Sequence, residues 1–321
     1  MEISPSIYEH AAQIIGATPW QASRNADLMY QAHAEAYKVY RHAPIMPGID
    51  IYNLEPEAYG AVIEEPSDCA IPAVRNHPIS DIDDILQLRP LDAAKDGRIP
   101  MQIEVGRRLG QTFPEAIVRV PISGPFSIAS NLMGFDRLIL SVADTPDKVA
   151  AALLHLVEGQ LSFARGVKEA GVDITFFESA ACPPMLSPTL FRKVELPALK
   201  KLLGGMKEIV GRPIPCVIGG NTAPIVEAML ETGTSYLVCP FETTQETFLK
   251  KVEHRLDVQI RINADLRIVA AGTKEQIRTE ADRVLALCRQ RPNSCLGTGA
   301  LPYETIPDNV LYMMEYVRSQ P

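Results

Sequence analysis

The stretch PIPCVIGGNTAPIVEAMLETGTSYLVCPF, residues 213–241, has the pattern that decides the fold. Two short apolar runs, PIPCVIGG and SYLVCPF, flank a segment with the mixed apolar and polar residues of an amphipathic helix. A strand, a helix and a second strand in this order predict two parallel strands of one sheet, buried on both faces. Gly219 and Gly220, where the first run ends, predict a tight turn or a close approach of a ligand to the backbone.

The same alternation of strands and helices extends over most of the chain. Helix-like segments at 146–170, 187–211, 221–233, 243–256 and 273–291 separate strand-like runs at 117–123, 173–179, 213–220, 235–241, 258–265 and 293–300. Two weaker runs, both interrupted by prolines, lie at 44–52 and 69–74 and bring the number of predicted strands to eight. No GxGxxG or GxxxxGKS/T motif occurs, which disfavours an open nucleotide-binding sheet. We therefore predict an α/β fold with a single (β/α)8 TIM barrel.

The N-terminal segment has a different pattern from the rest. Residues 1–40 are typical of helices laid across the outside of the barrel or over one end, so we predict an N-terminal helical extension. Residues 41–321 then form the barrel. No low-complexity linker separates the two parts, which predicts one domain overall.

Composition argues against several classes of function. Of the 321 residues 46% are hydrophobic, and the net charge of −8 is spread without blocks, which disfavours nucleic-acid or anionic-membrane binding. The N-terminus lacks the basic start and apolar run of a signal peptide, and no apolar stretch is long enough to span a bilayer. Six cysteines without a CxxC spacing suggest free thiols in a reducing compartment. We expect a cytoplasmic protein.

Five ordered motifs carry a resemblance to a known family. They are SGPFSIASNLMG (123–134), MLSPTLFRKVELPALKKL (185–202), IGGNTAPI (218–225), IRINADL (260–266) followed by AGTKEQI, and GTGALPYETIPDNV (297–310). Over about residues 40–318 the chain resembles the uroporphyrinogen decarboxylase superfamily. The resemblance implies a (β/α)8 barrel with the active site in its mouth. The superfamily contains true uroporphyrinogen decarboxylases, zinc-dependent methylcobamide:coenzyme M methyltransferases and other methyltransferases that work with corrinoid proteins.

The first predicted loop disfavours haem-pathway decarboxylation. True uroporphyrinogen decarboxylases have an arginine-rich segment there, which grips a substrate with eight carboxylates. The corresponding residues 41–60 lack that motif and offer Asp50, Glu55 and Glu57 instead. An Asp-x-Tyr-Asn-x-Glu segment in this loop resembles the methyltransferases of the superfamily more closely.

The zinc ligands of the coenzyme M branch are missing. The resemblance places them at Val217, at Gly219 and within Thr298–Ala300, where no side chain offers a thiolate or an imidazole. Zinc is therefore not expected at the family position, and coenzyme M is disfavoured as methyl acceptor. A substitute site made from Cys216, Cys239 and Cys295 is an alternative, although buried apolar cysteines are the stronger interpretation.

Polar residues at the ends of the predicted strands form the candidate site. Carboxyl groups in a water-poor barrel mouth have raised pKa values and act as general acids, and removal of a methyl group needs such activation of the leaving atom. We predict catalytic roles for Glu178, which ends the run DITFFES and ranks first, and for Tyr52, Asp50 and Glu242. The predicted binding residues are Asn53, Glu55, Ser123, Gly124, Asn221, Asn263, Asp265 and Tyr303. Glu195, inside a predicted helix, is interpreted as structural.

The leading hypothesis is a methyltransferase that moves a methyl group between a small O-, N- or S-methylated donor and the cobalt of a corrinoid protein. The corrinoid (cobalamin) would be carried by a partner chain, since this chain lacks a DxHxxG signature. Two alternatives stay open: a uroporphyrinogen decarboxylase-like enzyme, and a non-catalytic corrinoid or tetrapyrrole carrier. A homodimer is compatible with the sequence.

Overall fold

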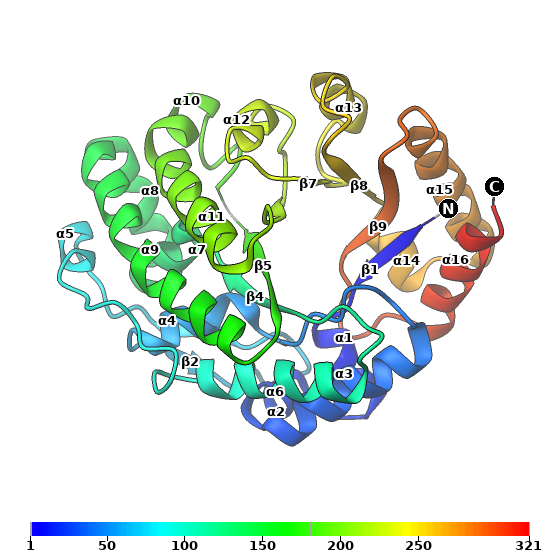
Figure 1. The fold of residues 1–321 in the computed structure, drawn as a ribbon, viewed down its shortest axis with the longest axis horizontal. Coiled ribbons are helices and arrows are strands. Elements are labelled where there is room, and N and C mark those ends of the chain that lie inside the picture. The colour runs from blue at the N-terminus through cyan, green and yellow to red at the C-terminus, as the bar shows by residue number, and fades with distance from the viewer. Residues whose placement is uncertain (1, 180, 321) are drawn as a thin grey trace.

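A curled parallel sheet of seven strands forms the centre of the computed structural model, which describes residues 2–179 and 181–320 (Figure 1). The strand order is β1-β9-β8-β7-β6-β5-β4, and every neighbouring pair is parallel. The strands are β1 (Ile3–Ser6), β4 (Arg119–Ser123), β5 (Asp173–Glu178), β6 (Cys216–Ile218), β7 (Tyr236–Cys239), β8 (Gln259–Asn263) and β9 (Ser294–Ala300). The six strand-like runs predicted between residues 117 and 300 are confirmed, and the fold is α/β with a barrel-like sheet.

One strand prediction near the N-terminus was wrong, and one strand was missed. The run at 69–74 does not join the sheet: β3 (Ala73–Asn76) pairs antiparallel with β2 (Val62–Glu64) in a separate hairpin. The sheet instead takes β1 from the segment expected to be helical, and β1 pairs with β9 near the other end of the chain (Figure 1). Four residues with a proline at a register shift give no local strand pattern, which is why sequence periodicity missed β1.

Closure of the sheet into an eight-stranded barrel stays a prediction. The run at 44–52 contributes an isolated parallel bridge between Ile45 and Val118, beside β4. Across the remaining gap, the Ser4 hydroxyl of β1 donates a hydrogen bond to the Ala43 carbonyl, at 2.9 Å. The segment before Asp50 therefore lies between the two edge strands of the sheet without forming a ladder with β1.

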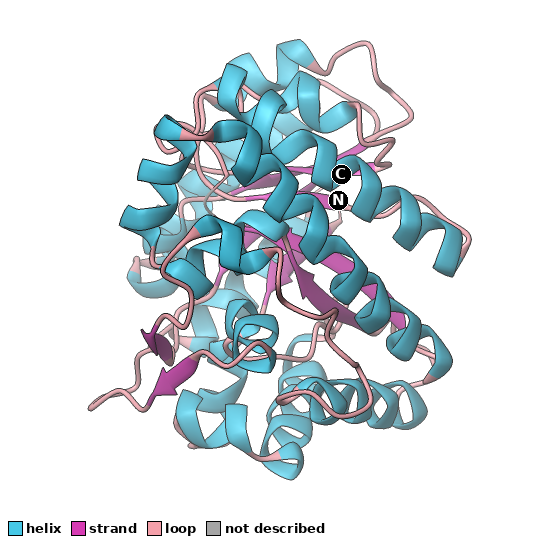
Figure 2. Ribbon diagram, turned by 90° about the vertical axis from the view of Figure 1, so that its left-hand side faces the viewer, coloured by secondary structure: helices cyan, strands magenta, loops and turns pink. Residues whose placement is uncertain are grey.

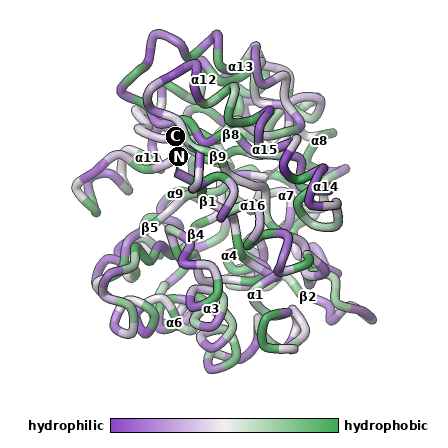
Figure 3. The backbone as a smooth tube through the Cα atoms, turned by 90° about the vertical axis from the view of Figure 1, so that its right-hand side faces the viewer, coloured by the Kyte–Doolittle hydropathy of each residue, from purple (hydrophilic) through white to green (hydrophobic). Residues whose placement is uncertain are grey.

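Helices surround the strands (Figure 2), and hydrophobic and hydrophilic residues alternate along them (Figure 3). Over the described residues they are α1 (Glu9–Ile14), α2 (Pro19–Arg24), α3 (Ala26–Tyr40), α4 (Leu54–Ala58), α5 (Ile82–Ile85), α6 (Ile99–Thr112), α7 (Pro125–Met133), α8 (Phe135–Asp144), α9 (Pro146–Glu169), α10 (Pro188–Leu190), α11 (Leu196–Val210), α12 (Val226–Leu230), α13 (Gln245–Lys251), α14 (Leu266–Ala271), α15 (Lys274–Cys288) and α16 (Pro307–Ser319). A 3₁₀ turn spans Ile51–Asn53, and a π-helical turn spans Phe191–Glu195.

The hydrophobic core lies between the strands and the helices. Residues of a strand that pack into this core alternate with residues that face the inside of the curled sheet. Ile174 and Phe176 of β5 are fully buried. Thr175 and Phe177 line a cavity inside the sheet, so alternate residues of the strand point to opposite faces. The same alternation directs Glu178, the last residue of β5, toward α7, and Glu178 also borders the larger cavity at the carboxyl ends of the strands.

Candidate functional site

A cavity of about 610 Å³ lies at the carboxyl ends of the strands. Its lining includes the ends of β1, β5, β6, β7, β8 and β9, together with residues 49–53 and 71–74. The carboxyl ends of parallel strands are where ligands bind in barrel-like α/β folds, because the loops that follow them converge there. Six predicted site residues line it: Asp50, Tyr52, Asn53, Glu178, Glu242 and Asn263.

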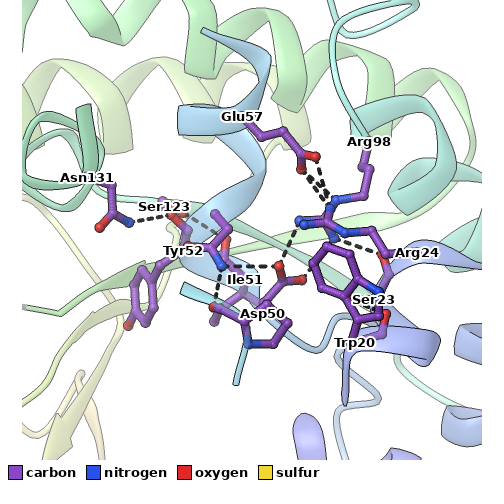
Figure 4. Close-up of polar contacts among 12 residues, drawn as sticks. Trp20, Ser23, Arg24, Asp50, Ile51, Tyr52, Glu57, Arg98, Ser123 and Asn131 are labelled. Carbon is purple, nitrogen blue, oxygen red and sulfur yellow. Dashed lines mark hydrogen bonds and ion pairs between the residues drawn. The ribbon is translucent and has the colours of Figure 1, made fainter. Parts of the chain in front are cut away.

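Asp50 is held by an ion pair. The guanidinium of Arg98 donates to both of its oxygens, at 2.8 and 2.7 Å, and donates a third bond to Glu57 at 2.6 Å (Figure 4). The Asn53 amide adds a hydrogen bond of 3.1 Å to Asp50. With both oxygens engaged by a buried cation, Asp50 is suited to fixing the first loop rather than to transferring a proton.

Tyr52 points away from this network (Figure 4) and borders the cavity. Its backbone carbonyl accepts a hydrogen bond of 2.8 Å from the Asn131 amide of α7, which fixes the turn. Burial, and the negative charge of Glu178, raise the pKa of the Tyr52 phenol. The hydroxyl therefore keeps its proton and is a hydrogen-bond donor in the cavity.

Glu178 has a carboxyl group fitted into a tight site between β5 and α7. One oxygen accepts hydrogen bonds from the Ser127 hydroxyl and from the Ser179 amide, the latter at 2.9 Å. A Cβ on Gly124 would collide with the carboxyl group, so this glycine makes room for it. Burial raises the pKa of Glu178 and favours its protonated form.

Glu195, which the sequence suggested is structural, lies next to Glu178. It ends the π-helical turn and is fully buried. No hydroxyl or N–H group of the described residues donates to its oxygens, and its hydrogen-bonding neighbour is the Glu178 carboxyl group. Burial and the charge of Glu178 raise the pKa of Glu195 well above its usual range. Two neighbouring buried carboxyl groups cannot both ionise readily, so at least one proton stays with the pair. The π-helical turn at Phe191–Glu195 is a feature often found at functional sites. The periodicity of residues 187–211 does not reveal it, because the segment has the pattern of an ordinary helix.

Glu55 and Ser123 lie behind the cavity rather than in it. Glu55 is fully buried and accepts hydrogen bonds from the Ser123 amide and hydroxyl, both at 2.8 Å. Burial raises the pKa of Glu55 to about 7. This contact ties α4 to the carboxyl end of β4, and through it the first loop to the sheet.

Three further predicted residues do not reach the cavity. Asn221 accepts a hydrogen bond of 3.0 Å from Thr243, and the helix after it begins only at Val226. Asp265 caps α14 and pairs with Arg267, which lowers the pKa of Asp265. Tyr303 is half-buried beside Cys69.

Two predicted residues at the cavity have a simpler environment. Glu242 is solvent-exposed at the rim, which suits contact with a partner or solvent more than a role as a buried acid. Asn263 is buried, and its side-chain oxygen has no hydrogen-bond partner in the described ranges, so it can accept one from a ligand.

Several lining residues come from β1 and the start of α1, in the segment predicted to form helices across the outside of the barrel or over one end. Ser6, Tyr8 and Glu9 all contribute to the cavity. Burial raises the pKa of Glu9 to about 7, and burial also raises the pKa of the Tyr8 phenol. Arg261 of β8 was missed as well, because candidates were sought at the ends of the predicted strands and Arg261 lies in the middle of one.

The positions of the missing zinc ligands face the cavity. Val217, Gly219 and Gly299 all line it, and none carries a ligand atom in its side chain. Cys216, Cys239 and Cys295 are fully buried, and burial raises the pKa of Cys295 to about 12. Among residues 2–179 and 181–320, no group of three or more His, Cys, Asp or Glu side chains is arranged to hold a metal ion.

Comparison with known proteins agrees with the architecture. The uroporphyrinogen decarboxylase (URO-D) family matches residues 4–320, which is nearly the whole chain. The chain belongs to the uroporphyrinogen decarboxylase family. The fold is similar to that of a methyltransferase from Methanosarcina mazei, with a TM-score of 0.84 and 21% sequence identity over 98% of this chain and 91% of that one. No curated protein matches. None of the described helices has the length and apolar character needed to cross a membrane.

Proposed function

We propose that this protein is a methyltransferase that moves a methyl group between a small O-, N- or S-methylated donor and the cobalt of a corrinoid carried by a partner protein. The observation that carries the proposal is that Tyr52 and Glu178 meet at one cavity, and burial favours the protonated form of both. Family membership and the fold shared with a methyltransferase support the proposal.

The two side chains would activate the leaving atom. During demethylation the bond between the methyl carbon and its heteroatom breaks, and the electron pair stays on the heteroatom. A hydrogen bond from the Tyr52 hydroxyl stabilises that pair, because Tyr52 borders the cavity and burial keeps its hydroxyl protonated. Glu178 lies near Tyr52, and the Glu178–Glu195 pair holds at least one proton behind it.

The corrinoid supplies the methyl-accepting cobalt and would dock with its carrier over the cavity mouth. A cavity of about 610 Å³ suits a small donor, while the exposed Glu242 at the rim offers a polar contact to a partner. The residues at the family's zinc position do not fit that metal, and no step here needs it. A homodimer remains compatible with this arrangement.

The cavity lining disfavours the decarboxylase alternative. Among the described residues, Arg261 is the one cationic side chain that lines this cavity. A substrate with eight carboxylates needs several cations to neutralise it. A non-catalytic carrier would have no turnover, so an activity assay distinguishes it from the proposed methyltransferase.

The test is anaerobic incubation of the purified protein with free cob(I)alamin and with methoxylated aromatics, methylamines, betaines and methyl thioethers in turn. The account predicts that one donor class converts cob(I)alamin to methylcobalamin, followed by absorbance. Absence of conversion with every donor, also after addition of candidate corrinoid proteins, would overturn the proposal. Release of CO2 from uroporphyrinogen would then favour the decarboxylase.

A further inference from the structure

Arg261 occupies an unusual position inside the sheet. It lies in the middle of β8 and lines the large cavity at the carboxyl ends of the strands. It also lines a second cavity of about 300 Å³ at the amino ends. The side chain therefore forms part of the floor between the two cavities, and only 6% of it is exposed.

The charge of Arg261 is not neutralised by the described part of the chain. Its guanidinium makes one hydrogen bond, of 3.1 Å, to the Ser6 hydroxyl, and its Nε atom is buried without a partner. No aspartate or glutamate of the described residues pairs with it. An arginine keeps its charge in proteins, and an unpaired buried charge is costly, so this side chain lacks a partner that it needs.

Other buried arginines of this chain show the contrast. Arg98 binds both oxygens of Asp50 and also Glu57. Arg291 donates to the backbone carbonyls of Val252, Arg255 and Val258, at 2.7 to 2.9 Å. Both have their donors satisfied by the protein itself, whereas Arg261 has donors left over beside a cavity.

The neighbouring strand is shaped to hold the Arg261 side chain. A Cβ on Gly297 of β9 would collide with the aliphatic stem of Arg261. Glycine at this position leaves the space that the stem occupies, and the Ser6 hydroxyl at the end of β1 fixes the guanidinium. The arrangement involves three strands, β1, β8 and β9, so the arginine is positioned rather than loosely placed.

The acidic groups around the cavity do not cancel the positive charge. Asp50 is paired with Arg98, and Glu242 lies exposed at the rim. Burial raises the pKa of Glu178, and that of Glu9 to about 7, so both hold a proton more readily than an exposed glutamate. Arg261 acts on the floor of the cavity, where its charge partly opposes the rise in the pKa of the Tyr8 phenol. The floor thus attracts an anion, and the proton donors Tyr52 and Glu178 border the same cavity.

We propose that Arg261 binds an anionic group of the substrate, so that the methyl donor is a small methylated carboxylate. This inference rests on the proposed function and names its substrate class. The planar guanidinium fork matches the two oxygens of a carboxylate. With the carboxylate on the floor, the methylated end of the molecule points toward Tyr52 and the open mouth, where the methyl acceptor docks. One cation suits a monocarboxylate.

Binding without any corrinoid tests the inference. Isothermal titration calorimetry would compare two carboxylates with amides of the same shape that lack the carboxylate charge. The pairs are 4-methoxybenzoate with the uncharged 4-methoxybenzamide, and glycine betaine with its amide, which keeps the quaternary ammonium. The wild-type protein should bind at least one carboxylate about 10- to 100-fold more tightly than its amide, the range expected for a hydrogen-bonded ion pair. Arg261→Gln should abolish that preference, and Arg261→Lys should keep part of it.

The matched control is Arg267→Gln, which removes a positive charge whose side chain is 82% exposed beside the cavity rim. It should leave the preference unchanged. The inference is overturned if the wild-type protein shows no preference for either carboxylate, or if a folded Arg261→Gln protein retains it. If Arg261→Gln does not fold, the reduced carboxylate preference of Arg261→Lys is the measurement that tests the inference.

Failure of this inference and failure of the proposed function have different signatures. Arg261-dependent carboxylate binding without any methyl transfer would contradict the methyltransferase and leave the anion site intact. Methyl transfer from an uncharged donor, undiminished in Arg261→Gln, would contradict the anion site and leave the methyltransferase intact.

Discussion

Protonation of a buried histidine should make the protein less stable in mild acid. His42 is 1% exposed, and neither ring nitrogen has a hydrogen-bond partner within the described residues. Burial, together with the neighbouring His33 and His10, lowers the pKa of His42 from 6.5 to about 3. The rings of Tyr37 and Tyr40 meet it edge-on, at 6.0 and 6.5 Å. No nearby group therefore compensates a proton on His42.

The sign and size of this effect on the free energy of unfolding follow from the difference in the His42 pKa between the folded and the unfolded protein. The unfolded chain takes up the proton below pH 6.5, whereas the folded protein resists it down to about pH 3. The contribution of neutral His42 to the free energy of unfolding is therefore complete above pH 6.5, and it is lost progressively as the pH falls below that value. Each pH unit corresponds to about 1.4 kcal/mol, so the loss at pH 5 is about 2 kcal/mol.

The assay is urea unfolding of the wild-type protein and of His42→Leu at pH 7.5 and pH 5. Glu9 and Glu55 titrate in the opposite sense, because their raised pKa values stabilise the folded state as the pH falls from about 7. The informative quantity is therefore the difference between the two proteins. His42→Leu should lose about 2 kcal/mol less than the wild type on acidification. His254→Gln, at an exposed histidine, should behave as the wild type. Equal acid sensitivity of His42→Leu and the wild type would refute the reasoning.

Three further predictions concern the site. Arg98→Met should lower the free energy of unfolding by about 3–5 kcal/mol, because it leaves the buried Asp50 charge unpaired, and Asp50→Asn in the same protein should recover part of the loss in urea unfolding. Gly124→Ala should displace the Glu178 carboxyl group. The rate of methyl transfer should then fall clearly, while the melting temperature changes little. Tyr52→Phe should reduce the rate of methyl transfer by about 100-fold with little change in donor affinity, and an unchanged rate would exclude the hydroxyl from the reaction.

Local patterns predicted the part of the fold built from consecutive strand–helix units. The runs that became β4 to β9 are apolar and β-branched, with helices between them, so their periodicity is visible within a few residues. β1 was missed because ISPS has no such periodicity and its partner β9 lies at the other end of the chain. The hairpin of β2 and β3 shows the opposite error, in which a plausible run pairs outside the sheet.

The candidate site was predictable where a residue ends a strand, and less so elsewhere. Tyr52 and Glu178 follow from that rule and border the cavity. Asp50 obeys it too, but its ion pair with Arg98 joins residues 48 positions apart, which no local pattern reveals. Glu195 and Arg261 are recognised only from their surroundings. The Glu195 carboxyl group is buried against that of Glu178, and the Arg261 guanidinium has no acidic partner among the described residues.

The most direct test of the central claim is anaerobic methyl transfer to cob(I)alamin, compared between the wild-type protein, Glu178→Gln and Tyr52→Phe. The account predicts conversion to methylcobalamin by the wild type with one donor class, and a large loss of rate in both variants while donor binding persists. Conversion at the wild-type rate in both variants would contradict the assigned roles, and no conversion by the wild type with any donor or corrinoid protein would contradict the methyltransferase itself.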